Sequence, residues 1–148
     1  MIFHGTENQS ISLFIAGYQF PENSTPKDFD ANWLNIHLEV DCKQGHWKRS
    51  DPALLSWEVE ELIAWLNAIL QERDNVLDVL IFTEPSLNFQ FKGKKGEHFL
   101  FRIELDLEFR NPNLEKDVPC FVDFRFSKTE VLALCLDLEE ELQYYPAR

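Results

Sequence analysis

Carboxylates are the side chains of this sequence best able to do chemistry, and several of them are closely spaced. Two groups stand out, one alternating and one consecutive: Glu104, Asp106 and Glu108, and Glu139, Glu140 and Glu141. A catalytic pair of carboxylates needs two different environments, one dry and one wet. Alternation is typical of the polar face of a strand, and a run of acids near the end of a helix is typical of solvated side chains. The spacing therefore predicts acidic surfaces and no acid–base pair.

The histidines give no pattern for metal binding. They are dispersed, without an i,i+4 pair and without a cluster of cysteines or aspartates at ligand spacing: His4, His37, His46 and His98. His37, Glu39 and Asp41 share one face of an expected strand, but three alternating residues span too far to coordinate one ion tightly. The glycine-rich motifs that bind phosphate are absent as well. We expect no metal and no cofactor.

Three cysteines, Cys42, Cys120 and Cys135, fit no C-x-x-C spacing and fall on the apolar phases of expected elements. Burial would raise the pKa of such thiols and lower their reactivity, although a nucleophilic Cys–His pair stays open as an alternative. Free thiols indicate a reducing compartment.

The first residues lack the basic and apolar regions of a signal peptide, and no run is long enough to span a membrane, so we expect a cytoplasmic protein.

The charge of the chain is strongly negative. Its 148 residues include 14 Lys and Arg against 26 Asp and Glu, a formal net charge of −12. Residues 1–74 carry −7 (5 basic, 12 acidic) and residues 75–148 carry −5 (9 basic, 14 acidic), so no acidic tail is responsible. Such a surface repels nucleic acid and anionic lipid and attracts cationic protein partners. Solubility alone is the other explanation of the charge. The length predicts a single domain, residues 1–148.

Alternating and helical apolar patterns divide the first half into three strands and a helix. We expect strands at 11–20, 33–42 and 46–56, a polar connection at 21–31, and an amphipathic helix at 57–72. Asp51-Pro52 should interrupt the third strand, and Ser56 is the expected N-cap of the helix.

The second half repeats that order with clearer signals. A long hairpin should run from Leu87 through the turn at 93–96 to Phe109, followed by a loop at 111–118 and a strand at 120–126. Ser127 and Glu130 then form a capping box that opens a helix ending near Tyr145-Pro146. We therefore predict an α+β fold, an antiparallel β-sheet with two amphipathic helices on one face, with a possible βββα duplication.

Three segments together resemble the WapI-like family of small bacterial immunity proteins. They are D-A-N-W-L at 30–34, DPALLSWE at 51–58 running into ELIAWL at 61–66, and FTEPSLNF at 82–89. The resemblance covers about residues 13–145 and rests on aromatic and turn positions. It implies a protein that neutralises a cognate toxin of a polymorphic contact-dependent system, and it brings no catalytic residues.

These observations favour a binding protein that is not an enzyme, and that occupies a cationic toxin domain through an acidic surface. The expected contacts are acids and aromatic residues of the first half: Asp28, Asp30, Trp33, Glu39, Asp41, Trp47, Glu58, Glu60 and Glu61. One alternative is a small-ligand module or enzyme with an aromatic pocket, lined by Trp33, Trp47, Trp57 and His46. Another is an oligomeric structural subunit with a buried aromatic patch.

Overall fold

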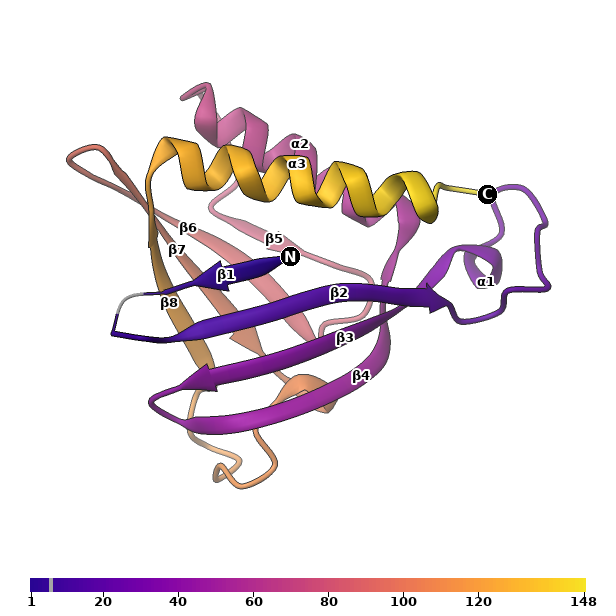
Figure 1. Cartoon of the computed structure of the whole chain (residues 1–148), viewed down its shortest axis with the longest axis horizontal. Helices are drawn as coiled ribbons and strands as arrows, with labels where there is room; N and C mark the ends of the chain where they lie inside the picture. The colour runs from indigo at the N-terminus through magenta and orange to yellow at the C-terminus, as the bar shows by residue number, and fades with distance from the viewer. Residues whose placement is uncertain (6) are drawn as a thin grey trace.

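The computed structural model describes residues 1–5 and 7–148, and within them the strands form two antiparallel four-stranded sheets (Figure 1). Sheet A has the strand order β1-β2-β3-β4, and sheet B has the order β5-β6-β7-β8. The predicted α+β class is confirmed, but the strands are divided between two sheets where one was expected. Each half of the chain consists of four sequential strands and then a long helix, so the predicted repetition has one more strand in each half.

Sheet A is built from strands whose apolar residues alternate inward. Its strands are β1 (Ile2–His4), β2 (Ser10–Tyr18), β3 (Trp33–Cys42) and β4 (Gly45–Leu55). β3 has the bounds that its alternation predicts, and its four inward aliphatic residues, Leu34 to Val40, are buried. β4 continues through Asp51-Pro52, where the register with β3 shifts beside Pro52. An edge strand tolerates proline because the ring nitrogen can face outward, away from the ladder.

Sheet B contains the predicted hairpin and a neighbouring strand on each side of it. Its strands are β5 (Val79–Ile81), β6 (Leu87–Lys95), β7 (His98–Leu105) and β8 (Phe121–Phe126). The expectation that β7 reaches Phe109 is wrong, because a 3-10 helix, η1 (Leu107–Phe109), follows Leu105. The Asp106 carboxylate accepts a hydrogen bond from the Leu107 amide at 2.8 Å, which caps η1 and ends the strand.

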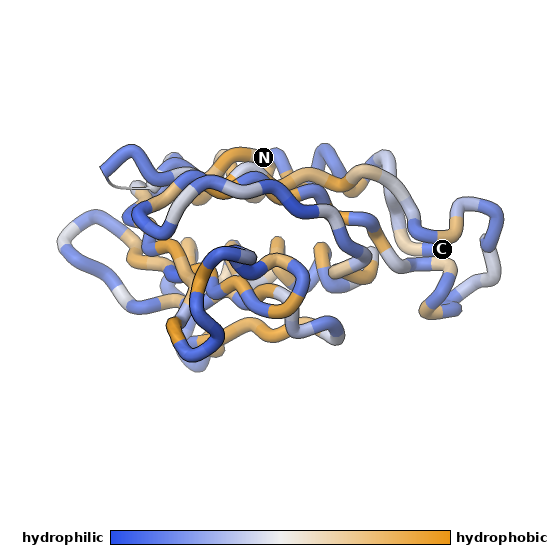
Figure 2. The backbone as a smooth tube through the Cα atoms, turned by 90° about the horizontal axis from the view of Figure 1, so that it is seen from below, coloured by the Kyte–Doolittle hydropathy of each residue, from blue (hydrophilic) through white to orange (hydrophobic). Residues whose placement is uncertain are grey.

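The core lies between the two sheets, which Figure 2 shows as two layers. Phe3 of β1 contacts Phe89 of β6 and Phe124 of β8, with ring centroids 6.0 and 5.8 Å apart. Helices α2 (Ser56–Leu70) and α3 (Lys128–Tyr144) pack on each other along one side of the sheets (Figure 1). A short helix, α1 (Phe29–Asn32), begins within the predicted polar connection at 21–31 and leads directly into β3.

The N-terminus of α2 differs from the sequence prediction. Leu55, not Ser56, is the N-cap, and the Glu58 carboxylate accepts a hydrogen bond from the Leu55 amide at 2.8 Å. Ser56 is buried, and its hydroxyl donates to the Asn32 carbonyl at 3.3 Å. The second Glu58 oxygen accepts from the Thr83 amide at 2.6 Å. Glu58 therefore joins the start of α2 to a distant loop.

The capping box predicted for α3 is confirmed. The Ser127 hydroxyl accepts from the Glu130 amide at 3.2 Å, and the Glu130 carboxylate accepts from the Ser127 amide at 2.6 Å.

Ser127→Ala is expected to lower the free energy of unfolding by about 1 kcal/mol, measured by urea denaturation. Thr129→Ala is the control, because Thr129 is exposed in the same turn and alanine favours the helix. Equal stability of the two variants would show that the box contributes nothing.

Candidate interaction surfaces

The acidic residues expected at one contact surface lie in two separate places. Asp30 is in α1, and Glu60 and Glu61 are in the first turns of α2. These two helices meet at the end of sheet A where β3 begins, because Trp33 pairs with Leu55 immediately before α2. Glu39 and Asp41 lie six and eight residues further along β3, about 20 Å or more from that end at ~3.3 Å per residue.

We call the first place the acidic end, defined by Asp28, Phe29, Asp30, Trp57, Glu60 and Glu61. Phe29 and Trp57 contact each other edge-to-face, with ring centroids 5.1 Å apart, and Phe29 is 53% exposed. Glu60 and Glu61 follow Trp57 by three and four residues, which places them on the same side of α2. The half-buried Asp28 caps α1 by accepting from the Asp30 amide at 3.3 Å. An accessible aromatic pair is thus flanked by carboxylates.

The acidic end is supported by contacts that the sequence did not indicate. Asn32 is buried, and its side-chain amide donates to the carbonyls of Asp28 and Arg148 at 2.7 and 3.0 Å. Its carbonyl oxygen accepts from the Arg148 amide at 2.7 Å. The Arg148 guanidinium lies over the Tyr18 ring, 3.4 Å from its centroid. The asparagine of the D-A-N-W-L segment therefore anchors α1 to a segment 116 residues away.

Two expected contact residues are buried and belong to the fold. Trp47 is 5% exposed, and its indole N–H donates to the Phe109 carbonyl at 2.9 Å. Glu58 is 4% exposed and accepts from two backbone amides, as described above. The expectation that either side chain faces a partner is therefore corrected. Trp33 remains half-buried on the outward phase of β3.

The aromatic pocket considered as an alternative does not form. Trp33 pairs with Leu55 at one end of β3, whereas Trp47 pairs with Val40 near the other end. Trp47 is buried, and Trp57 contacts Phe29 at the acidic end. The separation along β3 prevents these side chains from sharing a cleft.

Glu39 is partly neutralised by its neighbours on sheet A. Its carboxylate lies 3.1 Å from the Lys48 ammonium and 3.6 Å from the His46 ring, which pairs with it when protonated. Asp41 is exposed beside this cluster.

Among residues 1–5 and 7–148, no three His, Cys, Asp or Glu side chains are placed to hold a metal ion. In the same residues no helix is long and apolar enough to cross a membrane.

The cysteines are free thiols in or near the core, as the sequence indicated. Cys120 and Cys135 are buried, and Cys42 is half-buried. Burial raises the pKa of all three thiols, and with a smaller contribution from Glu139 it raises that of Cys135 to about 11. Thiols with raised pKa values are poor nucleophiles near neutral pH, because little thiolate is present.

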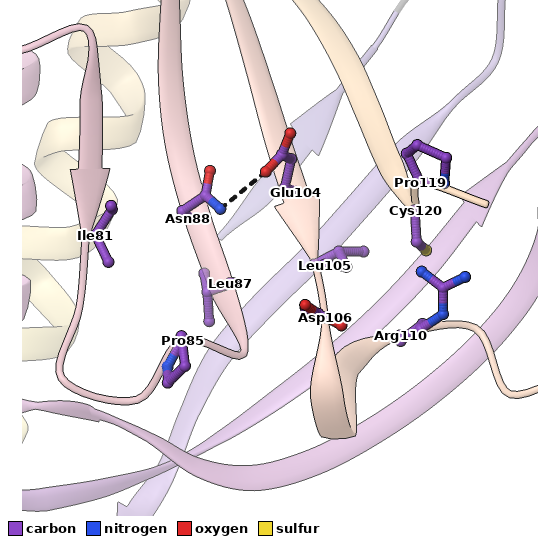
Figure 3. Close-up of a pocket in the computed structure, with 10 residues that line it drawn as sticks. All are labelled: Ile81, Pro85, Leu87, Asn88, Glu104, Leu105, Asp106, Arg110, Pro119 and Cys120. Atoms are coloured by element: carbon purple, nitrogen blue, oxygen red, sulfur yellow. Dashed lines mark hydrogen bonds between the residues drawn. The ribbon is translucent and has the colours of Figure 1, made fainter. Parts of the chain in front are cut away.

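A groove of about 320 Å³ lies at the end of sheet B (Figure 3). Ile81 and Pro85 form its β5 side, and Arg110 and Pro119 lie on its β8 side. Between them are the polar residues of β6 and β7 and the start of η1: Asn88, Glu104 and Asp106. The Asn88 side chain donates to Glu104 at 3.1 Å, and the Arg110 guanidinium donates to the carbonyls of Glu115 and Val118.

Asp51, on the edge strand β4, lies near further carboxylates. Burial, then Glu108 and then Glu84 raise its pKa above the ordinary value. The folded protein therefore holds this proton more tightly than the unfolded chain, and the stability this provides at low pH is lost as the pH rises through the raised pKa. Asp51→Asn should consequently be more stable than the wild type at about pH 7 and similar at about pH 3.

Thermal denaturation at the two pH values measures this difference, with Asp117→Asn as an exposed control. A loss of stability in Asp51→Asn at neutral pH would show instead that the ionised carboxylate makes a favourable contact.

Comparison with known proteins gives a match to a protein-family model. The model of the Immunity protein WapI-like family matches residues 1–146, which include both sheets and the helices α1, α2 and α3. No curated protein and no solved structure matches the chain.

Proposed function

The chain belongs to the WapI-like family of immunity proteins, and we propose that it binds and neutralises the toxin domain of a polymorphic toxin system. The acidic end is the observation that supports a contact surface of this kind. It presents an exposed aromatic residue, Phe29, packed on Trp57 and surrounded by carboxylates. Aromatic side chains commonly provide most of the binding energy at protein interfaces, and surrounding charges select the partner.

The proposed partner is a cationic toxin domain. A nuclease toxin must attract phosphate, so its substrate surface carries positive charge. A protein of net charge −12 approaches such a surface faster than a neutral protein and can occupy it. We propose inhibition by binding, without catalysis by the immunity protein. The three free thiols are consistent with the cytoplasm as the compartment.

Co-expression with the neighbouring toxin gene tests this function. The test uses the variable C-terminal domain of the large secreted protein that we expect to be encoded next to this gene, expressed alone in a host that it inhibits. We expect the immunity protein to restore growth and to co-purify with that domain. A toxin domain from an unrelated system is the specificity control and should not be neutralised. Growth inhibition that persists with a folded immunity protein would refute the proposal.

A further inference from the structure

The groove at the end of sheet B combines exposed aliphatic side chains with carboxylates. We propose that it receives a lysine or arginine side chain of the protein partner, with the stem against Ile81 and Pro85 and the cationic group between Glu104 and Asp106. This inference rests on the proposed function and identifies a second contact region, formed by residues other than those of the acidic end.

The two carboxylates are positioned to accept a cationic group. Glu104 is half-buried in β7, and Asp106 follows immediately after that strand, both lining the groove (Figure 3). Each accepts one hydrogen bond, Glu104 from Asn88 at 3.1 Å and Asp106 from the Leu107 amide at 2.8 Å. Within residues 1–5 and 7–148 neither forms a salt bridge, although Arg102 acts on Glu104 electrostatically, and oxygen lone pairs of both carboxylates remain available.

Aliphatic side chains beside these carboxylates are unusually accessible. Ile81 is 67% exposed on the edge strand β5, and Leu107 is 55% exposed next to Asp106. Grouped exposed apolar side chains are typical of interaction sites.

A basic side chain matches both parts of the groove. Lysine and arginine place an apolar stem on aliphatic surface and carry a cation at the tip. An apolar side chain would bury Glu104 and Asp106 without compensation, and an anion would be repelled by both. Arg110 lines the β8 side and keeps its positive charge, so a cationic occupant is favoured on the side of Ile81, away from that guanidinium (Figure 3).

The site can be tested on the full chain with two short peptides that need no toxin. The probes are acetyl-Leu-Arg-Leu-amide and the same peptide with citrulline, which has the shape of arginine without its charge. Backbone amide shifts of ¹⁵N-labelled protein are followed at low ionic strength. The arginine peptide is expected to shift residues of β5, Asn88 and Leu107 saturably. The citrulline peptide should bind about tenfold more weakly, because its charge-assisted contacts are missing.

Two double variants with equal charge change show where the peptide binds. The variant Glu104→Gln/Asp106→Asn should bind the arginine peptide about tenfold more weakly than the wild type. The variant Glu139→Gln/Glu140→Gln, on the exposed side of α3, should bind it as tightly as the wild type. Equal binding of both peptides, equal loss in both variants, or shifts confined to the acidic end would overturn the inference. Failure of the wild type to neutralise the toxin would count against the proposed function, whatever the peptides do.

Discussion

Replacing Glu58 by alanine is expected to lower the free energy of unfolding by about 3 kcal/mol. The Glu58 carboxylate accepts from the amides of Leu55 and Thr83 at 2.8 and 2.6 Å, and the side chain is 4% exposed. Its removal leaves the buried Leu55 amide without an acceptor and also breaks the hydrogen bond to the exposed residue Thr83. It also removes a negative charge from the first turn of α2, where the helix dipole favours one. Urea denaturation followed by circular dichroism measures the loss.

Glu61→Ala is the matched control, because Glu61 is an exposed acid in the same part of the helix. Its stability should stay within about 0.5 kcal/mol of the wild type. Glu58 was expected from the sequence to contact a partner, and the two variants separate that role from a structural one. A Glu58→Ala protein of normal stability that no longer bound the toxin would support the contact role and contradict the structural one.

Local rules predicted the elements whose residues carry complete signals. The alternation from Leu34 to Val40 defined β3, and the spacing of Ser127 and Glu130 defined the start of α3, because both depend on neighbours in sequence. β1 and β5 were missed because three residues are too few to show a period. Their pairing with β2 and β6 is decided by tertiary contacts.

The division into two sheets could not be read from alternation. Every second residue of a strand is apolar whether its buried face packs on a second sheet or on helices. The contacts of Phe3 with Phe89 and Phe124 decide between these arrangements, and they join residues far apart in the chain. The same limit explains η1, where Leu107 and Phe109 continued the apparent alternation although Asp106 had ended the strand.

The candidate contacts remain a prediction, and the structure changes only how they are grouped. From sequence alone, a glutamate near the start of a helix is expected to be exposed to solvent. Glu58 is buried because its side chain turns toward the loop at Thr83, whose amide it binds. Asp30, Glu60 and Glu61 come together because α1 and α2 both adjoin the Trp33–Leu55 pair. That proximity depends on strand register, which no spacing in the sequence reveals.

Reversing the charges of Asp30, Glu60 and Glu61 to lysine is expected to slow association with the toxin domain at least about tenfold at low salt. All three are exposed at the acidic end, and Asp28 is left intact because it caps α1. Three reversals of two charges each change the net charge from −12 to −6, which weakens long-range attraction to a cationic partner. The dependence of the association rate on salt should flatten correspondingly.

Stopped-flow association rates at several salt concentrations test this, with a control that has the same net charge. The control reverses Glu97, Glu139 and Glu140, which are exposed residues of the second half. If only net charge matters, both variants should slow association equally, because the mean field of the protein is the same. Slower association in the first variant alone requires that the partner approach the acidic end, where the carboxylates flank Phe29 and Trp57.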